Sequence, residues 1–206
     1  MVSDKPSKDL LHQILQELQT LYDEREAKRM ASWLIEDLFN LSTLQVQFNE
    51  PIDWSIEREA KIEDAINRLK KNEPIQYITE RADFFGLEFK VSPSTLIPRP
   101  ETEELVDCIL RENQQNPTAH MLDIGTGSGC IPISIQTKMP LSNLKSIDIS
   151  EEALTIAQEN NQRLNTKVTF YKKDILNELL TEFEKFDVII SNPPYVGNDE
   201  MQSLPQ

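Results

Sequence analysis

The sequence has few cysteines and histidines, two of the residue types that commonly bind metal ions. It contains two cysteines and two histidines among 206 residues. Cys108 and Cys130 have no spacing typical of metal ligands. Two cysteines of this kind are best interpreted as small, half-buried apolar residues in a reducing compartment. We therefore expect no metal site.

The chain also lacks the apolar segments that direct a protein to or across a membrane. No apolar run approaches the roughly 20 residues that a membrane-spanning helix needs. The first residues, MVSDKPSKDLLHQ, have no unbroken apolar core behind basic residues, which a signal peptide would have. We expect a cytoplasmic protein.

Positive charge is scarce. Lysine and arginine total 21 against 35 aspartates and glutamates, which gives a formal net charge of −14. A surface this acidic repels phosphate backbones, so free DNA or RNA is a poor candidate partner. Acidity often serves solubility alone, so the charge only ranks the alternatives.

The first third of the chain has apolar residues at helical spacing. Three sets, within 10–21, 30–39 and 56–69, predict helices, and Ser55 is placed to cap the third. Asn49, Pro51 and Asp53 are loop-forming residues, so we expect a loop around 49–53. The pattern predicts a helical bundle over residues 1–78.

A different pattern follows, over residues 79–100. Residues 84–91 alternate after Gly86 and predict a β-hairpin. Three prolines then interrupt the backbone, and the last of them, Pro100, is suited to start a helix. The buried face of that helix is expected to hold four apolar residues: Leu105, Val106, Ile109 and Leu110. We interpret 79–100 as a hairpin and linker.

From residue 101 to residue 206 the chain alternates predicted strands with helices. The strands are expected at 120–124, 144–149, 168–171 and 186–191, with one helix from about residue 128 and another capped by Ser150. This alternation predicts an α/β domain with a parallel, Rossmann-like sheet that binds ligands at the carboxyl ends of its strands. Such sheets usually continue beyond a fourth strand, so we expect an incomplete sheet and a truncated domain.

Three of the five glycines lie in one loop, Asp123-Ile-Gly125-Thr-Gly127-Ser-Gly129, where the first predicted strand meets its helix. The loop does not fit the dinucleotide pattern G-x-G-x-x-G, because Cys130 or Pro132 occupies the last glycine position, and no P-loop lysine follows. The form D-x-G-x-G-x-G suits S-adenosylmethionine, which has no pyrophosphate. Asp123 can meet the cofactor's cationic amino group, and the loop amides can face its carboxylate.

Further acidic residues lie at the ends of the next two strands, with Asp148 ending the second strand and Asp174 after the third. Asp148 can accept hydrogen bonds from the ribose hydroxyls, and Asp174 can accept one from the adenine amino group. Each alone is more often a cap or turn residue, but their register with the glycine loop favours a cofactor site. The predicted cofactor-binding set is Asp123, Gly125, Thr126, Gly127, Gly129, Asp148, Ile149, Asp174, Ile175 and Asn192.

The fourth strand is followed by Asn192-Pro193-Pro194-Tyr195. This tetrapeptide could be a rigid turn, but it also suits methylation of a planar nitrogen. The Asn192 side-chain oxygen and the Pro193 carbonyl can accept both N–H groups of an amide or amine, and Tyr195 offers a flat face. We expect Asn192, Pro193 and Tyr195 to be catalytic.

Together, DIGTGSG, Asp148 and NPPY resemble class I amino-methyltransferases. Three upstream segments, 73–78, 85–87 and 96–103 (LIPRPETE), are similar to the family of peptide chain release factor glutamine N5-methyltransferases. The resemblance implies a helical domain that engages the release factor and a methyltransferase domain that uses S-adenosylmethionine. It also implies that the glutamine of a Gly-Gly-Gln motif is bound by a set comprising Asn192, Pro193, Pro194, Tyr195, Arg99 and Glu101. We expect a monomer.

Three alternatives remain open. A sister family methylates a glutamine of a ribosomal protein with the same chemistry, although its segment matching IPRPETE differs. Adenine-N6 or guanine-N2 nucleic acid methyltransferases can also carry NPPY, but they would need a basic binding surface. The chain could also be a non-catalytic fragment that contributes only an interaction surface.

Overall fold

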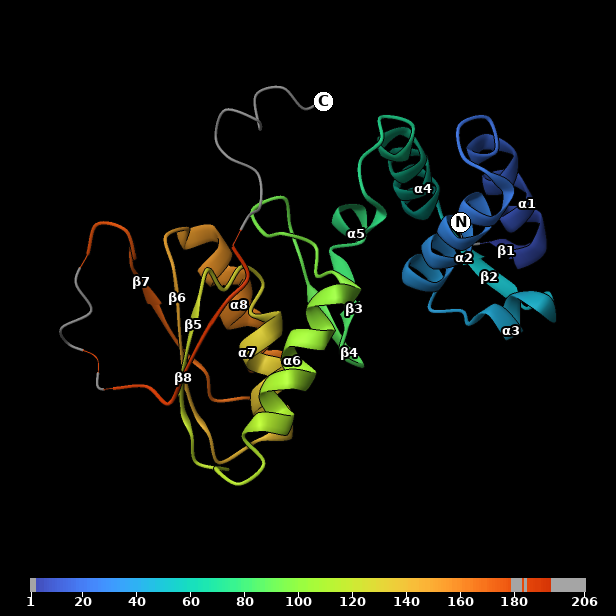
Figure 1. Ribbon diagram of the computed structural model, residues 1–206. Helices are drawn as coiled ribbons and strands as arrows, with labels where there is room; N and C mark the ends of the chain where they lie inside the picture. The colour runs from blue at the N-terminus through green and yellow to red at the C-terminus, as the bar shows by residue number, and fades with distance from the viewer. Residues whose placement is uncertain (1–2, 179–182, 184, 194–206) are drawn as a thin grey trace. The chain divides into compact units, whose positions relative to one another are not determined.

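The computed structural model describes residues 3–178, 183 and 185–193 (Figure 1). The chain divides into two compact units, Met1–Glu80 and Arg81–Gln206. The hairpin expected within 79–100 belongs to the second unit. The finer division into 1–78, 79–100 and 101–206 stays a prediction.

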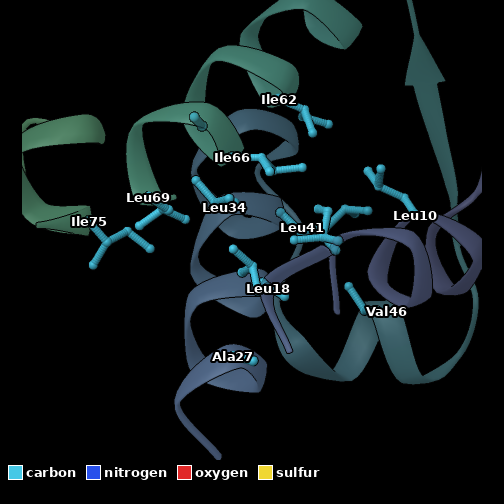
Figure 2. Packing of buried hydrophobic residues seen from close by; sticks show 14 of the residues in the cluster. Leu10, Leu18, Ala27, Leu34, Leu41, Val46, Ile62, Ile66, Leu69 and Ile75 are labelled. Atoms are coloured by element: carbon cyan, nitrogen blue, oxygen red, sulfur yellow. The ribbon is translucent and has the colours of Figure 1, made fainter. Parts of the chain in front are cut away.

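The first unit is mostly helical, and its three predicted helices are confirmed. Its helices are α1 (Ser7–Leu18), α2 (Glu24–Phe39), α3 (Thr43–Gln47), α4 (Ile56–Leu69) and α5 (Ile75–Ile78). The side chain of Ser55 caps α4 by accepting a hydrogen bond from the Arg58 N–H. Leu10, Leu18 and Leu34 meet in the buried core between these helices (Figure 2). Leu21 lies beyond the end of α1 and is exposed.

The prediction of a loop around 49–53 is wrong in part. Residues Pro51–Trp54 form strand β2, which pairs antiparallel with β1 (Ser3–Pro6). The partner strand lies more than 40 residues away in sequence, so the local residue pattern carries no sign of it. A two-stranded sheet consists of edge strands only, and edge strands tolerate proline.

The second unit opens with the predicted hairpin, which is confirmed as β3 (Arg81–Phe84) and β4 (Leu87–Lys90). Phe85 and Gly86 form its two-residue turn with φ angles of 52° and 73°. Two consecutive positive φ angles are typical of the hairpin turns that match strand twist. Phe84 and Phe89 are buried and pack edge to face, so the hairpin is part of this unit's core.

A four-stranded sheet forms the centre of the second unit. Its strands are β5 (His120–Ile124), β6 (Asn143–Asp148), β7 (Thr169–Lys172) and β8 (Val188–Ser191). All neighbours are parallel, in the order β7-β6-β5-β8, which confirms the predicted α/β sheet. In sequence order this is 3-2-1-4, the arrangement of a doubly wound sheet. Such a sheet places its ligand site beside β5.

Three helices lie on one side of this sheet (Figure 1): α6 (Pro100–Glu112), α7 (Cys130–Lys138) and α8 (Glu151–Arg163). Pro100 starts α6 as predicted, and Val106 and Ile109 form its buried face. Pro132 is tolerated because it lies in the first turn of α7, where its missing N–H has no helical partner to lose.

The expectation that both cysteines are half-buried is wrong. Cys130 is buried at the start of α7, whereas Cys108 is exposed because it lies on the solvent side of α6. Within the described part of the chain, no helix is long and apolar enough to cross a membrane.

Candidate cofactor and substrate site

The glycine loop connects β5 to α7 at the carboxyl edge of the sheet. Gly129 has a φ of +78°, and a Cβ there would lie 2.9 Å from the Ile133 Cδ1 and 3.2 Å from the Ala157 Cβ. Glycine at this position therefore lets α7 and α8 approach closely. By contrast, a Cβ at Gly125 or Gly127 would meet no atom within 4 Å. These two glycines border open space in which a ligand can approach the backbone.

Asp148, at the end of β6, is bonded directly to this loop. Its Oδ2 accepts a hydrogen bond from the Gly127 N–H at 2.9 Å, and its Oδ1 accepts one from the Ser150 N–H at 3.0 Å. A carboxylate has about four acceptor positions. Each oxygen therefore retains capacity to accept a ribose hydroxyl while it shapes the loop.

Asp123 is a buried carboxyl group beside the loop, with 1% of its surface exposed. The Ser146 hydroxyl donates to its Oδ2 at 2.7 Å, while its Oδ1 has no hydrogen-bond partner among the described residues. Burial raises the pKa of Asp123 from 3.8 to about 6, and the nearby hydroxyls of Ser146 and Thr126 oppose this rise. A buried carboxyl oxygen without a partner fits the cationic amino group of S-adenosylmethionine.

Asp174 lies in the turn that follows β7. Its carboxylate accepts hydrogen bonds from the Asn177 side-chain amide at 2.7 Å and from the Leu176 N–H at 3.0 Å. These bonds hold the pKa of Asp174 below its usual value. The side chain thus stabilises its own turn, and its contact with adenine stays a prediction. Two predicted cofactor residues, Ile149 and Ile175, are exposed apolar side chains next to Asp148 and Asp174.

Asn192 follows β8 and lies at the same edge. Its side-chain Nδ2 donates a hydrogen bond to the Thr102 Oγ1 at 3.2 Å. The preceding residue, Ser191, pairs with Ile124 across the sheet, and its hydroxyl donates to the Ile124 carbonyl at 3.1 Å. Pro193 is exposed. Pro194 and Tyr195 lie outside the described residues.

The segment 96–103 contributes through residues that the sequence did not single out. Arg99 and Glu101, the predicted substrate contacts, are both exposed. Their neighbours instead contact residues that are distant in the sequence. The Thr102 hydroxyl accepts a hydrogen bond from Asn192, and the Glu103 carboxylate accepts one from the Phe85 N–H at 2.7 Å. No local pattern distinguishes these two from other polar residues in the first turn of a helix.

Asn160 is a third residue that sequence reasoning missed. It is fully buried on α8, where its Nδ2 donates to the carbonyls of Ser128 and Lys90, both at 2.9 Å. Its Oδ1 accepts from the Lys90 N–H at 2.7 Å. One side chain therefore fastens the glycine loop to the hairpin. An asparagine in a helix gives a signal only when it falls on the apolar face, as this one does.

Strand register explains how the separate motifs meet. Ile124 of β5 is opposite Ile147 of β6 on one side and Ser191 of β8 on the other. The glycine loop, Asp148 and Asn192 follow these three positions and lie side by side at one edge. A 3-2-1-4 parallel sheet with this loop, this buried carboxyl and this second-strand acid defines a class I methyltransferase dependent on S-adenosylmethionine.

Comparison with known proteins narrows the class. Residues 102–204 match the model of the methyltransferase small domain, and residues 9–79 match that of the PrmC N-terminal domain. The release factor glutamine methyltransferase of Bacteroides thetaiotaomicron is 43% identical over 191 residues, covering 93% of this chain and 68% of that protein. The chain belongs to the release factor glutamine methyltransferase family.

Other relatives have similar coverage. The release factor glutamine methyltransferase of Flavobacterium psychrophilum is 39% identical, with 93% of this chain and 68% of that protein covered. That of Streptococcus pneumoniae is 39% identical, with 87% and 63% covered. Among solved structures, a ribosomal protein L11 methylase from Lactobacillus delbrueckii subsp. bulgaricus is 28% identical, with a TM-score of 0.41 and 50% of this chain and 51% of that chain covered. The chain thus spans about two thirds of the length of these curated relatives.

Proposed function

We propose that this protein transfers a methyl group from S-adenosylmethionine to the side-chain amide nitrogen, N5, of the glutamine in the Gly-Gly-Gln motif of a class I peptide chain release factor. The observation that carries the proposal is the position of Asn192 and Pro193, which follow β8 directly beside β5 and its glycine loop. The names of the relatives support the same substrate.

Residues from three strand ends would hold the cofactor. Asp123 would pair with its amino group, the loop from Gly125 to Gly129 would face its carboxylate, and Asp148 would accept its ribose hydroxyls. Thr126, Ile149, Asp174 and Ile175 complete the proposed pocket. The bound cofactor supplies a methyl group that is already activated by a sulfonium leaving group, so no metal or covalent intermediate is needed.

The target nitrogen is a poor nucleophile because its lone pair is delocalised into the carbonyl group. The Asn192 Oδ1 and the Pro193 carbonyl would each accept one N–H of the glutamine amide and aim the nitrogen at the methyl group. Proline restricts the residue before it to extended conformations, so the Asn-Pro-Pro sequence holds both acceptors in advance. Pro194 and Tyr195 would pack against the planar amide, with Arg99 and Glu101 at the rim.

Catalysis in this scheme depends on positioning and on fixed dipoles. Holding two reactants in reactive geometry can contribute about 7–11 kcal/mol, and the two acceptors stabilise the charge that develops on the nitrogen. The methylated nitrogen then carries one proton more than the product amide. That proton is lost after transfer, so no strong general base is assigned.

The partner in this proposal is a protein, which agrees with the net charge of −14. An acidic surface disfavours the nucleic acid substrates of other NPPY methyltransferases. The helical unit, whose residues 9–79 match the PrmC N-terminal domain, would engage the release factor. We propose that the enzyme acts as a monomer in the cytoplasm, where release factors meet the ribosome.

The test is transfer of labelled methyl from S-adenosylmethionine to a purified class I release factor. The release factor is supplied as wild type and with the Gly-Gly-Gln glutamine changed to alanine. The enzyme is supplied both as the 206-residue chain and as a chain extended to the length of its curated relatives. Label on the wild-type factor alone is expected. Label on neither factor, or on both, would overturn the proposed target.

A further inference from the structure

We propose that Thr102 is a positioning residue that fixes the orientation of the Asn192 carboxamide, so that its oxygen faces the target amide. This inference rests on the proposed function, and it gives segment 96–103 a part in the reaction. The observation is the hydrogen bond from the Asn192 Nδ2 to the Thr102 Oγ1, at 3.2 Å. That distance lies within the normal range for an N–H···O hydrogen bond.

The chemistry of the two amides makes the orientation matter. A glutamine amide presents N–H donors to the site, so Asn192 must present its oxygen and not its own NH2 group. A carboxamide turned by 180° would bring donor against donor and hold the target nitrogen out of line. A threonine hydroxyl can accept or donate a hydrogen bond; here the Thr102 hydroxyl accepts from the Asn192 NH2 group, and the Asn192 oxygen therefore lies on the other side of the carboxamide.

Both residues are held by rigid elements. Thr102 lies in the first turn of α6, where its own N–H donates to the Arg99 carbonyl at 3.0 Å. The adjacent Glu103 fastens this turn to the hairpin at the Phe85 N–H. Asn192 directly follows β8, which pairs with the central strand β5. The distance from Thr102 to Asn192 is therefore set by the fold before any substrate arrives.

The first experiment compares turnover of wild type, Thr102→Val and Thr102→Ser in the chain extended to the length of its curated relatives. Valine keeps the shape of threonine and removes the hydroxyl, whereas serine keeps the hydroxyl. We expect Thr102→Val to lower kcat roughly tenfold, the scale of one lost hydrogen bond, with the KM for the release factor and the Kd for the cofactor little changed. Thr102→Ser is expected to restore most of the turnover. Equal kcat in wild type and Thr102→Val would overturn the inference.

The matched control is Thr155→Val. Thr155 lies exposed on α8, and its hydroxyl donates to the Glu151 carbonyl within the same helix. The substitution is chemically identical but removes no contact with Asn192, so turnover should stay at the wild-type value. If Thr155→Val lowers kcat as much as Thr102→Val does, the loss reflects a general effect of valine and the inference fails.

A double-mutant cycle separates positioning from a purely structural role. If Thr102 acts only through Asn192, adding Thr102→Val to Asn192→Ala should lower turnover no further than Asn192→Ala alone. Independent, multiplying losses would contradict the inference. Thr102→Ala enters the same cycle, so that a folding defect peculiar to valine does not decide the outcome.

A measurement without substrate keeps this inference distinct from the proposed function. The side-chain NH2 resonances of Asn192, assigned by their loss in Asn192→Ala, are expected to shift in Thr102→Val and not in Thr155→Val. Unchanged resonances would remove the structural basis of the inference even if release factors are methylated. Conversely, shifted resonances with no labelling of any release factor would overturn the proposed function and, with it, the positioning role in the reaction assigned to Thr102.

Discussion

The carboxylate of Asp148 and the backbone N–H of Gly127 are joined by a hydrogen bond of 2.9 Å, which links the end of β6 to the middle of the glycine loop. The loop is also held from β6 by the Ile147 carbonyl, which accepts from the Gly125 and Thr126 N–H groups at 2.9 Å and 3.2 Å. The residue proposed to bind ribose therefore also shapes the surface on which the rest of the cofactor would lie.

This double role predicts a large effect of Asp148→Ala. The substitution removes the ribose acceptor and releases the loop, and a hydrogen bond to a charged group contributes about 1.5–3 kcal/mol. We expect the Kd for S-adenosylmethionine to rise at least tenfold, measured by calorimetry. Asp107→Ala, which removes an exposed carboxylate from α6, is the control and should leave the Kd unchanged. An unaltered Kd in Asp148→Ala would refute the ribose assignment.

The raised pKa of Asp123 predicts that the free energy of unfolding depends on pH. Burial raises its pKa from 3.8 to about 6, so the folded protein holds this proton more tightly than the unfolded chain does. The contribution to stability is complete below pH 3.8 and is lost as the pH rises through about 6. For a fully buried group this rise corresponds to about 3 kcal/mol.

The measurement is urea unfolding of wild type and Asp123→Asn, without cofactor, between pH 4 and pH 8. Asparagine does not ionise, so the stability of the variant relative to wild type should increase across this range and level off above pH 7. Comparing the two proteins removes the contribution of other titrating groups. Parallel pH profiles would show that the Asp123 pKa is not raised by burial.

Cofactor binding should have the opposite pH dependence at the same residue. The cationic amino group of S-adenosylmethionine would pair with the ionised form of Asp123, so the cofactor has to displace the proton below pH 6. We expect the Kd to rise as the pH falls from 7 to 5, with about half a proton released per cofactor bound near pH 6 and close to one proton near pH 5. Calorimetry in two buffers of different ionisation enthalpy measures that proton. The Asp123→Asn variant should show weaker binding with no such pH dependence.

The parts that the sequence predicts and the parts that it does not differ in physical origin. The glycine loop, the Ser55 and Ser150 caps and the strands of the sheet are encoded locally, because turn residues, caps and alternation act over a few positions. Strand β2 pairs with residues about 45 positions away, and Asn160 bonds to Lys90, 70 positions away, so neighbouring residues do not identify these partners, even though Asn160 falls on the apolar face of its helix.

The residues of the candidate site also fall into those that the sequence predicts and those that it does not. Asp123 and Asp148 lie near the ends of predicted strands and Asn192 follows one, and parallel topology then brings their positions to one edge. Which residues of 96–103 face that edge depends on how the first turn of α6 packs. The family resemblance implies contacts for Arg99 and Glu101, which are exposed, whereas Thr102 and Glu103 make the contacts with Asn192 and Phe85.

The glycine loop offers a prediction that separates folding from binding within one segment. Gly125 and Gly129 both have positive φ angles, +77° and +78°, so alanine brings backbone strain at either position, of order 1–3 kcal/mol. Only at Gly129 does the added Cβ also meet neighbours, with the Ile133 Cδ1 at 2.9 Å and the Ala157 Cβ at 3.2 Å. Gly129→Ala should therefore unfold at lower urea concentration than Gly125→Ala.

The affinity for the cofactor should depend on whether the space beside the Cβ position of Gly125 or Gly129 is free of protein atoms. A Cβ at Gly125 would point into space that is free of protein atoms within 4 Å, where the cofactor is proposed to lie. Gly125→Ala should raise the Kd for S-adenosylmethionine at least tenfold while it costs less stability than Gly129→Ala. Urea unfolding and calorimetry on both variants test this pair of expectations. If Gly125→Ala binds the cofactor as tightly as wild type does, the open space beside Gly125 is not where the ligand lies, and the cofactor site has to be placed elsewhere on the sheet edge.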